Sequence, residues 1–141
     1  MSATKTTQPP LQIVIYSHNQ DTRAHIASSL GRQIAMDLPE HRITEIATGP
    51  ALRLHVDSKK HVDLFILDGE AQPEGGMGIA RELKDEVFNC PPVLLVVARQ
   101  SDAWLASWSK ADDVMMHPAD PFSLADKAAS LLRKTSLLAH S

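Results

Sequence analysis

Asp68 is the side chain of this sequence that is best placed for chemistry. It ends the largely apolar run of residues 62–67, and Gly69 follows it directly. An apolar run without regular polar alternation is typical of a strand that is covered on both faces, as in parallel sheets. Functional groups of open α/β sheets gather at the carboxyl ends of the strands. We therefore expect Asp68 at such an end, where its reactivity depends on the side chains beside it.

The elements that must position Asp68 follow from hydrophobic periodicity and from the places of proline and glycine. Besides the strand that ends at Asp68, the sequence predicts strands at 11–16, 43–48, 93–98 and 114–116. It predicts helices at 21–36, 49–58, 77–88 and 120–133, and a short helix that holds Trp104 and Trp108. Strands that alternate with helices in this way imply a parallel sheet with helices on both faces and right-handed crossovers.

The composition suits a soluble globular protein. The chain has 141 residues, a net charge of -3, 43% hydrophobic and 22% charged residues, enough for one domain with a real core. We expect a disordered leader at 1–10, a domain at 11–134 and a tail at 135–141. No Lys/Arg stripe indicates nucleic acid, and no apolar run approaches the roughly 20 residues of a membrane helix. Cys90 is the only cysteine, which suits a reducing compartment, so we expect a cytoplasmic protein.

Four markers along the chain resemble the receiver domain of bacterial response regulators. They are Leu67-Asp68 in the third strand, Gly76 before the third long helix, Ala111-Asp112-Asp113 before the last strand, and His117-Pro118 after it. The resemblance covers residues 11–134. It implies an α/β fold of the flavodoxin-like (CheY-like) kind, with three α/β/α layers and a five-stranded parallel sheet in the order 2-1-3-4-5. It also implies a place in two-component signalling or a phosphorelay, and a cis peptide bond before Pro118.

Three segments resemble more closely a group of actinobacterial orphan receivers. They are residues 67–71, 75–80 and 104–109. Members of that group carry no output domain and have been linked to the respiratory NADH:quinone oxidoreductase, complex I. The resemblance therefore implies a protein partner, namely a subunit of the hydrophilic arm of complex I. It also implies a cytoplasmic location that is peripheral to the inner membrane through this partner, without direct membrane insertion.

The groups that a working receiver uses beside its aspartate are changed in this chain. Receivers transfer a phosphoryl group onto the third-strand aspartate with the help of Mg²⁺, which prefers oxygen ligands. The family's acidic pair corresponds to Ser17 and His18, its fourth-strand hydroxyl to Val97, and its lysine to His117. Removing one oxyanion donor alone costs about 3–4 kcal/mol in a well-studied hydrolase. We therefore expect no efficient phosphotransfer, and expect Asp68 to cap the turn that follows it.

The family's fold would also bring His18, Asp68 and His117 together, with Glu70 near them. Two imidazoles and a carboxylate are ligand types of Zn²⁺ and non-haem Fe²⁺. One hypothesis is therefore a metal site made by these three residues, and the other is a hydrogen-bonded polar cluster. We favour the polar cluster and expect neither a metal nor another cofactor.

Trp104 and Trp108 are four residues apart in the predicted short helix, so they share one of its faces. One interpretation places them in the core. The other leaves at least one of them exposed in the free domain and buried by a partner, because tryptophan is enriched in interface hot spots. The resemblance adds that receivers commonly dock partners through the fourth helix, the fifth strand and the fifth helix.

These observations favour a non-catalytic pseudo-receiver that acts as a protein-interaction module, as an accessory subunit or regulator of actinobacterial complex I. Two alternatives stay open. The chain could be a single-domain response regulator that is phosphorylated at Asp68, or a small metal-binding protein that uses His18, Asp68 and His117.

Overall fold

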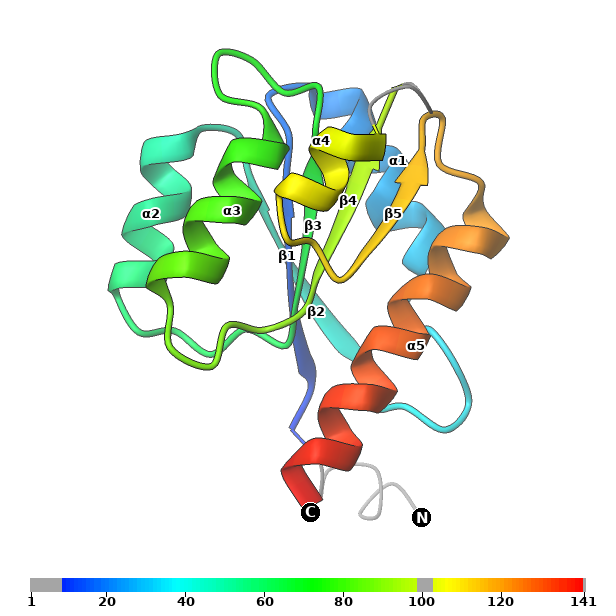
Figure 1. Ribbon diagram of the computed structural model, residues 1–141. Coiled ribbons are helices and arrows are strands. Elements are labelled where there is room, and N and C mark those ends of the chain that lie inside the picture. Colours follow the sequence, from blue (N-terminus) through cyan, green and yellow to red (C-terminus); the bar gives the residue numbers. More distant parts are fainter. Residues whose placement is uncertain (1–8, 99–102, 141) are drawn as a thin grey trace.

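A computed structural model describes residues 9–98 and 103–140, without the side chains of residues 103, 105, 106 and 135–140. Within these ranges strands and helices alternate along the chain (Figure 1). The strands are β1 (Leu11–Tyr16), β2 (His41–Ile46), β3 (Leu64–Asp68), β4 (Val93–Val97) and β5 (Asp113–Met116). The helices are α1 (Gln20–Leu30), α2 (Gly49–Asp57), α3 (Gly76–Glu86), α4 (Ala103–Trp108) and α5 (Pro121–His140).

The strands form one parallel sheet in the order β2-β1-β3-β4-β5. The helices cover both faces, with α2 and α3 on one side of the sheet and α1 and α5 on the other (Figure 1). The alternation of elements predicted this parallel sheet with helices on both faces, and the strand order is the flavodoxin-like order that the resemblance implied. The central strand β3 pairs with β1 through Ile15 and Ile66 and with β4 through Ile66 and Leu94.

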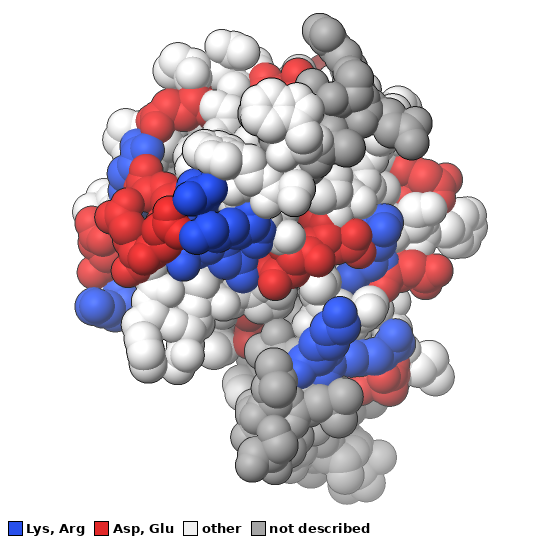
Figure 2. All heavy atoms as spheres, viewed as in Figure 1, with Lys and Arg blue, Asp and Glu red and all other residues white. Residues whose placement is uncertain are grey.

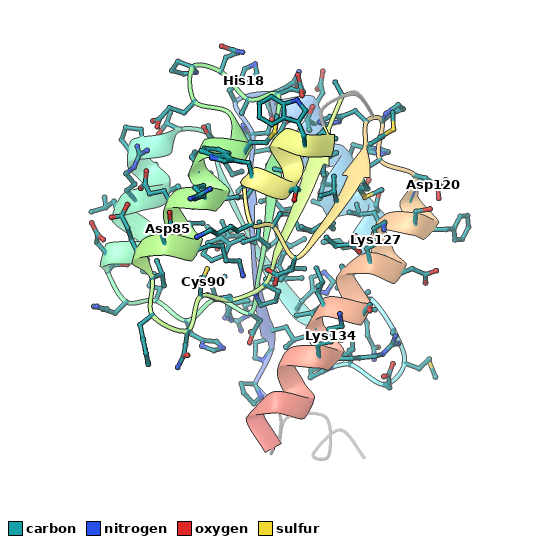
Figure 3. All side chains as sticks on the ribbon, in the orientation of Figure 1. His18, Asp85, Cys90, Asp120, Lys127 and Lys134 are labelled. Atoms are coloured by element: carbon teal, nitrogen blue, oxygen red, sulfur yellow. The ribbon has the colours of Figure 1, made fainter. Side chains whose placement is uncertain are left out.

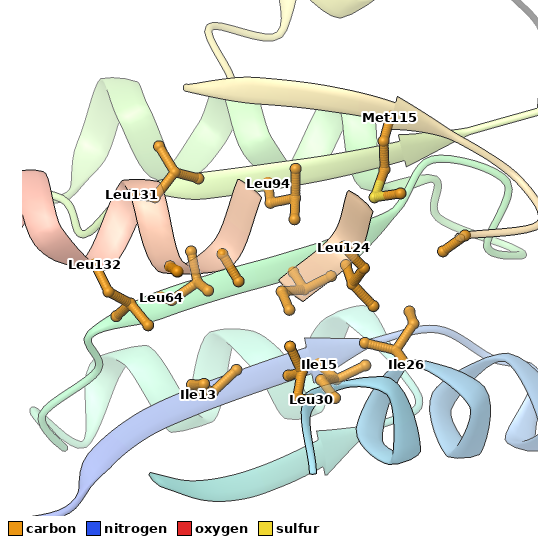
Figure 4. Close-up of a cluster of buried hydrophobic side chains, with 14 of the residues drawn as sticks. Ile13, Ile15, Ile26, Leu30, Leu64, Leu94, Met115, Leu124, Leu131 and Leu132 are labelled. Carbon is orange, nitrogen blue, oxygen red and sulfur yellow. The ribbon is translucent and has the colours of Figure 1, made fainter. Parts of the chain in front are cut away.

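The core is divided by the sheet into two clusters. Successive side chains of a strand point to opposite faces, so Ile13, Ile15, Leu64 and Ile66 pack against α1 and α5 (Figure 4). Val14, Tyr16, Phe65 and Leu67 pack against α2 and α3. All five residues of β3 and of β4 are buried, which explains why their sequences show no polar alternation. Each fully buried aliphatic side chain contributes about 1.5–3 kcal/mol through removal from water.

Two helix boundaries differ from the sequence prediction. α1 ends at Leu30 rather than at residue 36, because Gly31 adopts a left-handed φ of 61° and so ends the right-handed helix. Ile34 still packs on the core, from the loop, and its apolar character made the helix seem longer. α5 continues to His140 through the residues expected to be a tail, because none of residues 134–140 is glycine or proline.

Other boundaries agree with the prediction to within two or three residues, and Asn19 caps α1 by accepting from the backbone of Asp21 and Thr22. Most of the leader expected at 1–10 lies outside the described residues. No helix in the described part of the chain combines the length and the apolar character that are needed to cross a membrane.

Candidate functional site

Asp68 is the last residue of β3, at the sheet edge where the parallel strands end. The same edge carries Ser17, directly after β1, and His117, directly after β5. Asp68 is only 3% exposed and Ser17 is fully buried. The start of α3 lies very close to the end of β3. A Cβ on Gly76 would lie 2.7 Å from the backbone oxygen of Asp68. Only glycine permits this approach of α3 to β3, which explains the marker at position 76.

Both carboxylate oxygens of Asp68 are occupied by donors from the protein. Ser17 Oγ donates to Oδ2 over 2.7 Å. The backbone N–H of Glu70 and the ring Nε2 of His117 lie 2.8 and 2.9 Å from Oδ1. His117 therefore carries its proton on Nε2 when it is neutral, since a carboxylate can only accept. Donors attached to three different strands or loops thus converge on one buried carboxylate.

The electrostatics of this cluster keep Asp68 ionised. Burial is the largest influence and raises its pKa, but the hydrogen bonds from His117, Ser17 and Glu70 together outweigh it, so the pKa is lowered. The carboxylate thus has its hydrogen bonds satisfied without a metal ion. Asp68 caps the following turn through Glu70 N–H, as predicted.

His18 does not join the cluster, contrary to our expectation. Its Nδ1 accepts a hydrogen bond from the backbone N–H of Gln72 over 2.8 Å, and its side chain lies exposed at the edge of the sheet (Figure 3). Among the side chains that the structure describes, no group of three His, Cys, Asp or Glu is placed to hold a metal ion. The structure therefore favours the polar cluster over a metal site at His18, Asp68 and His117.

The remaining predicted positions surround the cluster without touching the carboxylate through their side chains. Val97 is 2% exposed and offers no hydroxyl, although its backbone oxygen accepts from the His117 N–H. Glu70 turns away and accepts from the backbone of Ala98 over 3.2 Å. The peptide bond between His117 and Pro118 is cis, as the resemblance implied.

Sequence reasoning missed a second set of contacts, which holds the loop between β3 and α3. The buried hydroxyl of Tyr16 donates to the backbone oxygen of Glu74 over 2.5 Å, and burial raises the pKa of this phenol. Arg53 donates to both Glu74 and Glu82. The available signal was Tyr16 itself, because a tyrosine that ends a buried strand needs a partner for its hydroxyl.

The two tryptophans of α4 lie on the surface. Trp104 is 69% exposed and Trp108 is 46% exposed, so the core interpretation is wrong for both. The guanidinium of Arg81 lies 5.1 Å from the centre of the Trp108 ring and donates to the Trp108 backbone oxygen over 2.9 Å. Met116 at the end of β5 and Phe122 in α5 are exposed as well.

Comparison with known proteins relates this fold and this site to one family. Two proteins of Mycobacterium tuberculosis, from strains CDC 1551 / Oshkosh and ATCC 25618 / H37Rv, are each named a response regulatory protein. Each is 48% identical to this chain over 123 residues, which are 87% of this chain and 92% of the relative. No family model matches the chain.

Solved receiver domains share the architecture. The signal receiver domain of a Luxo repressor protein from Vibrio parahaemolyticus superposes with a TM-score of 0.76 at 14% identity, covering 92% of this chain and 95% of the other. The BeF3-activated receiver domain of DrrB gives 0.72 at 16% identity, covering 89% and 99%. A receiver from Bermanella marisrubri gives 0.73 at 21% identity, covering 88% and 99%. With its architecture and with relatives that are 48% identical over most of their length, this chain belongs to the response regulator family and has the receiver-domain fold.

Proposed function

We propose that this protein is a pseudo-receiver, which works by binding a protein partner and does not transfer phosphate. The observation that carries the proposal is the hydrogen bonding of Asp68. Both of its carboxylate oxygens accept from protein donors, and Ser17 and His117 supply two of these bonds. A Mg²⁺ ion at this carboxylate would have to displace such donors, and it would find neither acid of the family's pair.

The change in charge leads to the same proposal. An acidic pair beside Asp68 would leave three carboxylates to be balanced by a divalent cation and a lysine. In this chain one carboxylate remains, and a hydroxyl and an imidazole donate hydrogen bonds to it. The hydrogen bonds of Asp68 thus link the ends of β1, β3 and β5, and we infer that they hold the domain in one conformation.

The exposed tryptophans supply a surface for the partner. Trp104, Trp108, Met116 and Phe122 are all more than two-fifths exposed, and they belong to the α4, β5 and α5 part of the fold on which receivers commonly dock. Large exposed apolar side chains on a docking part of a fold are candidates for interaction sites. We call these four side chains the α4 face.

We propose the hydrophilic arm of respiratory complex I as the partner, with the protein as an accessory subunit or regulator. The support is the resemblance of residues 67–71, 75–80 and 104–109 to actinobacterial orphan receivers that have been linked to this complex. The protein would then lie in the cytoplasm, peripheral to the inner membrane through that partner.

Co-purification tests this proposal. The tagged protein, expressed in its native cells at its natural level, is expected to emerge with complex I subunits at a fixed stoichiometry. Trp104→Ala together with Trp108→Ala should remove them, and Phe88→Ala should not, because Phe88 is 90% exposed but lies outside the α4 face. Recovery of the wild-type protein alone would contradict the proposal.

A second candidate is a single-domain response regulator that is phosphorylated at Asp68. It is favoured by the retained aspartate at the end of β3 and by the family of the relatives. Incubation with acetyl phosphate and Mg²⁺, followed by intact-mass measurement, separates the two candidates. A phosphoryl adduct that forms on the wild type and is absent from Asp68→Asn would favour the switch.

A further inference from the structure

We propose that the partner of the α4 face carries a carboxylate beside its apolar side chains, and that this carboxylate binds against Arg81 and Lys110 at the border of α3 and α4. The inference rests on the proposed interaction function and specifies the chemistry of the partner. It follows from an uneven ion-pair cluster next to Trp108.

In this cluster two cations share one carboxylate. Arg81 Nε lies 3.0 Å from Asp85 Oδ2, and Lys110 Nζ lies 2.5 Å from Asp85 Oδ1. Asp85 is on α3 (Figure 3), and Lys110 follows α4. The nearby pair of Lys84 and Asp112 is one-to-one, so it leaves no charge over. The cluster of Arg81, Asp85 and Lys110 therefore has one positive charge in excess, within a chain whose net charge is -3.

The excess charge lies directly beside the apolar surface. Figure 2 shows Lys and Arg side chains immediately below the uncharged surface over α4, with acidic side chains on both sides of them. Arg81 connects the two regions physically, because its guanidinium lies over the Trp108 ring and also binds Asp85. The Lys110 side chain is 49% exposed, and an ammonium carries three N–H donors, so it can bind a second acceptor beside Asp85.

These features select the occupant. A partner segment with apolar side chains for the two indoles and one Glu or Asp at its border would supply the missing carboxylate. That ion pair would form next to apolar contacts that the partner buries. Close charge pairs at interfaces contribute coupling energy to binding. A segment with Lys or Arg at the same place would be repelled by the excess charge. We infer an amphipathic helix or strand with an acidic border.

Intrinsic fluorescence reads this site directly, because Trp104 and Trp108 are the only tryptophans of the chain. The probes are three amphipathic peptides of about 15 residues, without Trp or Tyr, which differ in a single border residue that is Glu, Gln or Lys. We expect the Glu peptide to shift the emission to the blue and to bind about tenfold more tightly than the Gln peptide, with the Lys peptide weakest. Added salt should reduce this difference.

Matched variants locate the effect. Lys110→Gln removes the excess charge and should abolish the preference for Glu. Lys127→Gln, which removes a cation that is paired with Asp113 on the other side of β5, should preserve it. Equal binding of the three peptides, no binding of the Glu peptide, or an unchanged preference in Lys110→Gln would overturn the inference.

The same variants distinguish the inference from the proposed function. In the co-purification experiment, the charge reversal Lys110→Glu should release the partner as the double tryptophan variant does. If the tryptophan variant loses the partner while Lys110→Glu retains it, the interaction function stands and the acidic-partner inference fails. If neither variant loses the partner, the α4 face itself is wrong.

Discussion

At the scale of single residues, the hydrogen-bond donors around Asp68 decide which further groups its carboxylate can bind. By the resemblance, Asp68 corresponds to the phosphoacceptor of receivers, and Ser17, Glu70 and His117 all donate to it. On the pseudo-receiver proposal, a hydroxyl and an imidazole at these places replace the groups that would hold a cation. Because its pKa is lowered in the folded protein, the ionisation of Asp68 is linked to folding.

This linkage predicts how stability depends on pH. The pKa of folded Asp68 lies below its ordinary value, so the carboxylate stabilises the fold above the unfolded pKa of about 3.9. The contribution is lost as the pH falls from about 5 through the lowered folded pKa. Asp68→Asn should therefore cost about 1–3 kcal/mol in free energy of unfolding at pH 7, and less at pH 3.5. Urea unfolding at the two pH values checks this, and a pH-independent difference would contradict it.

Ser17→Ala tests one donor alone. Ser17 is fully buried, its hydroxyl donates to Asp68, and it accepts from the backbone of Asn19. Its removal should lower the free energy of unfolding by about 1–2 kcal/mol. The effect should be much smaller in the Asp68→Asn background, because the charged acceptor is already absent, and a double-mutant cycle measures this coupling. Additive effects would show that the bond to the carboxylate is not what Ser17 contributes.

At the scale of elements, the approach of α3 to β3 is as important as the side chains. The first residue of α3, Gly76, leaves no room for a Cβ against the Asp68 backbone, whereas Gly78 two residues later faces open space. Tyr16 and Arg53 fasten the intervening loop from β1 and α2. The end of β3 is thus held by contacts from its neighbours in the sheet and in the helix layer.

Two glycine substitutions in α3 should have opposite effects. Gly76→Ala should destabilise the protein by about 1–3 kcal/mol, because its Cβ would meet backbone rather than a movable side chain. Gly78→Ala should stabilise it by about 0.5–1 kcal/mol, since alanine reduces the entropy cost of the helix and nothing lies within 4 Å of its Cβ. Thermal unfolding of the two variants checks the direction of each change in stability. Destabilisation by Gly78→Ala would contradict the open space described beside Gly78.

At the scale of the whole molecule, the parallel sheet collects groups that are far apart in the sequence at one edge. Ser17, Asp68, Val97 and His117 each lie at or just beyond the carboxyl end of a different strand. The framework of a working receiver is therefore retained while its chemical groups are changed. On the pseudo-receiver proposal the loss of reactivity would be local, and substitution should reverse it.

Restoring the family's groups should restore reactivity. We expect the quadruple variant Ser17→Asp, His18→Asp, Val97→Thr and His117→Lys to gain one phosphoryl group from acetyl phosphate in the presence of Mg²⁺, while the wild type gains none. Intact mass measures the adduct. Asp68→Asn in the quadruple background is the control, and it should abolish the adduct. A folded quadruple variant that stays unmodified would show that the framework also has changed.

The order of strands and helices could be read from the sequence, because apolar periodicity, prolines and caps act over a few neighbouring residues. The place of Asp68 at a strand end followed in the same way. The helix that was expected to reach residue 36 was wrong because Ile34 carries the apolar pattern past Gly31, where the helix ends. Local pattern alone did not separate a core contact made by a loop from one made by a helix.

The sequence by itself determined the elements, the edge at which Asp68 lies and the chemical types that replace its family partners. Only the tertiary structure decided which of them meet. His18 and His117 are equally plausible neighbours in the sequence, but His117 binds Asp68 whereas His18 binds the backbone of Gln72. Helical spacing predicted that both tryptophans share one face of α4, but it did not show whether the core covers that face. Such contacts join segments that are distant along the chain, so they depend on packing directions that short-range pattern does not contain.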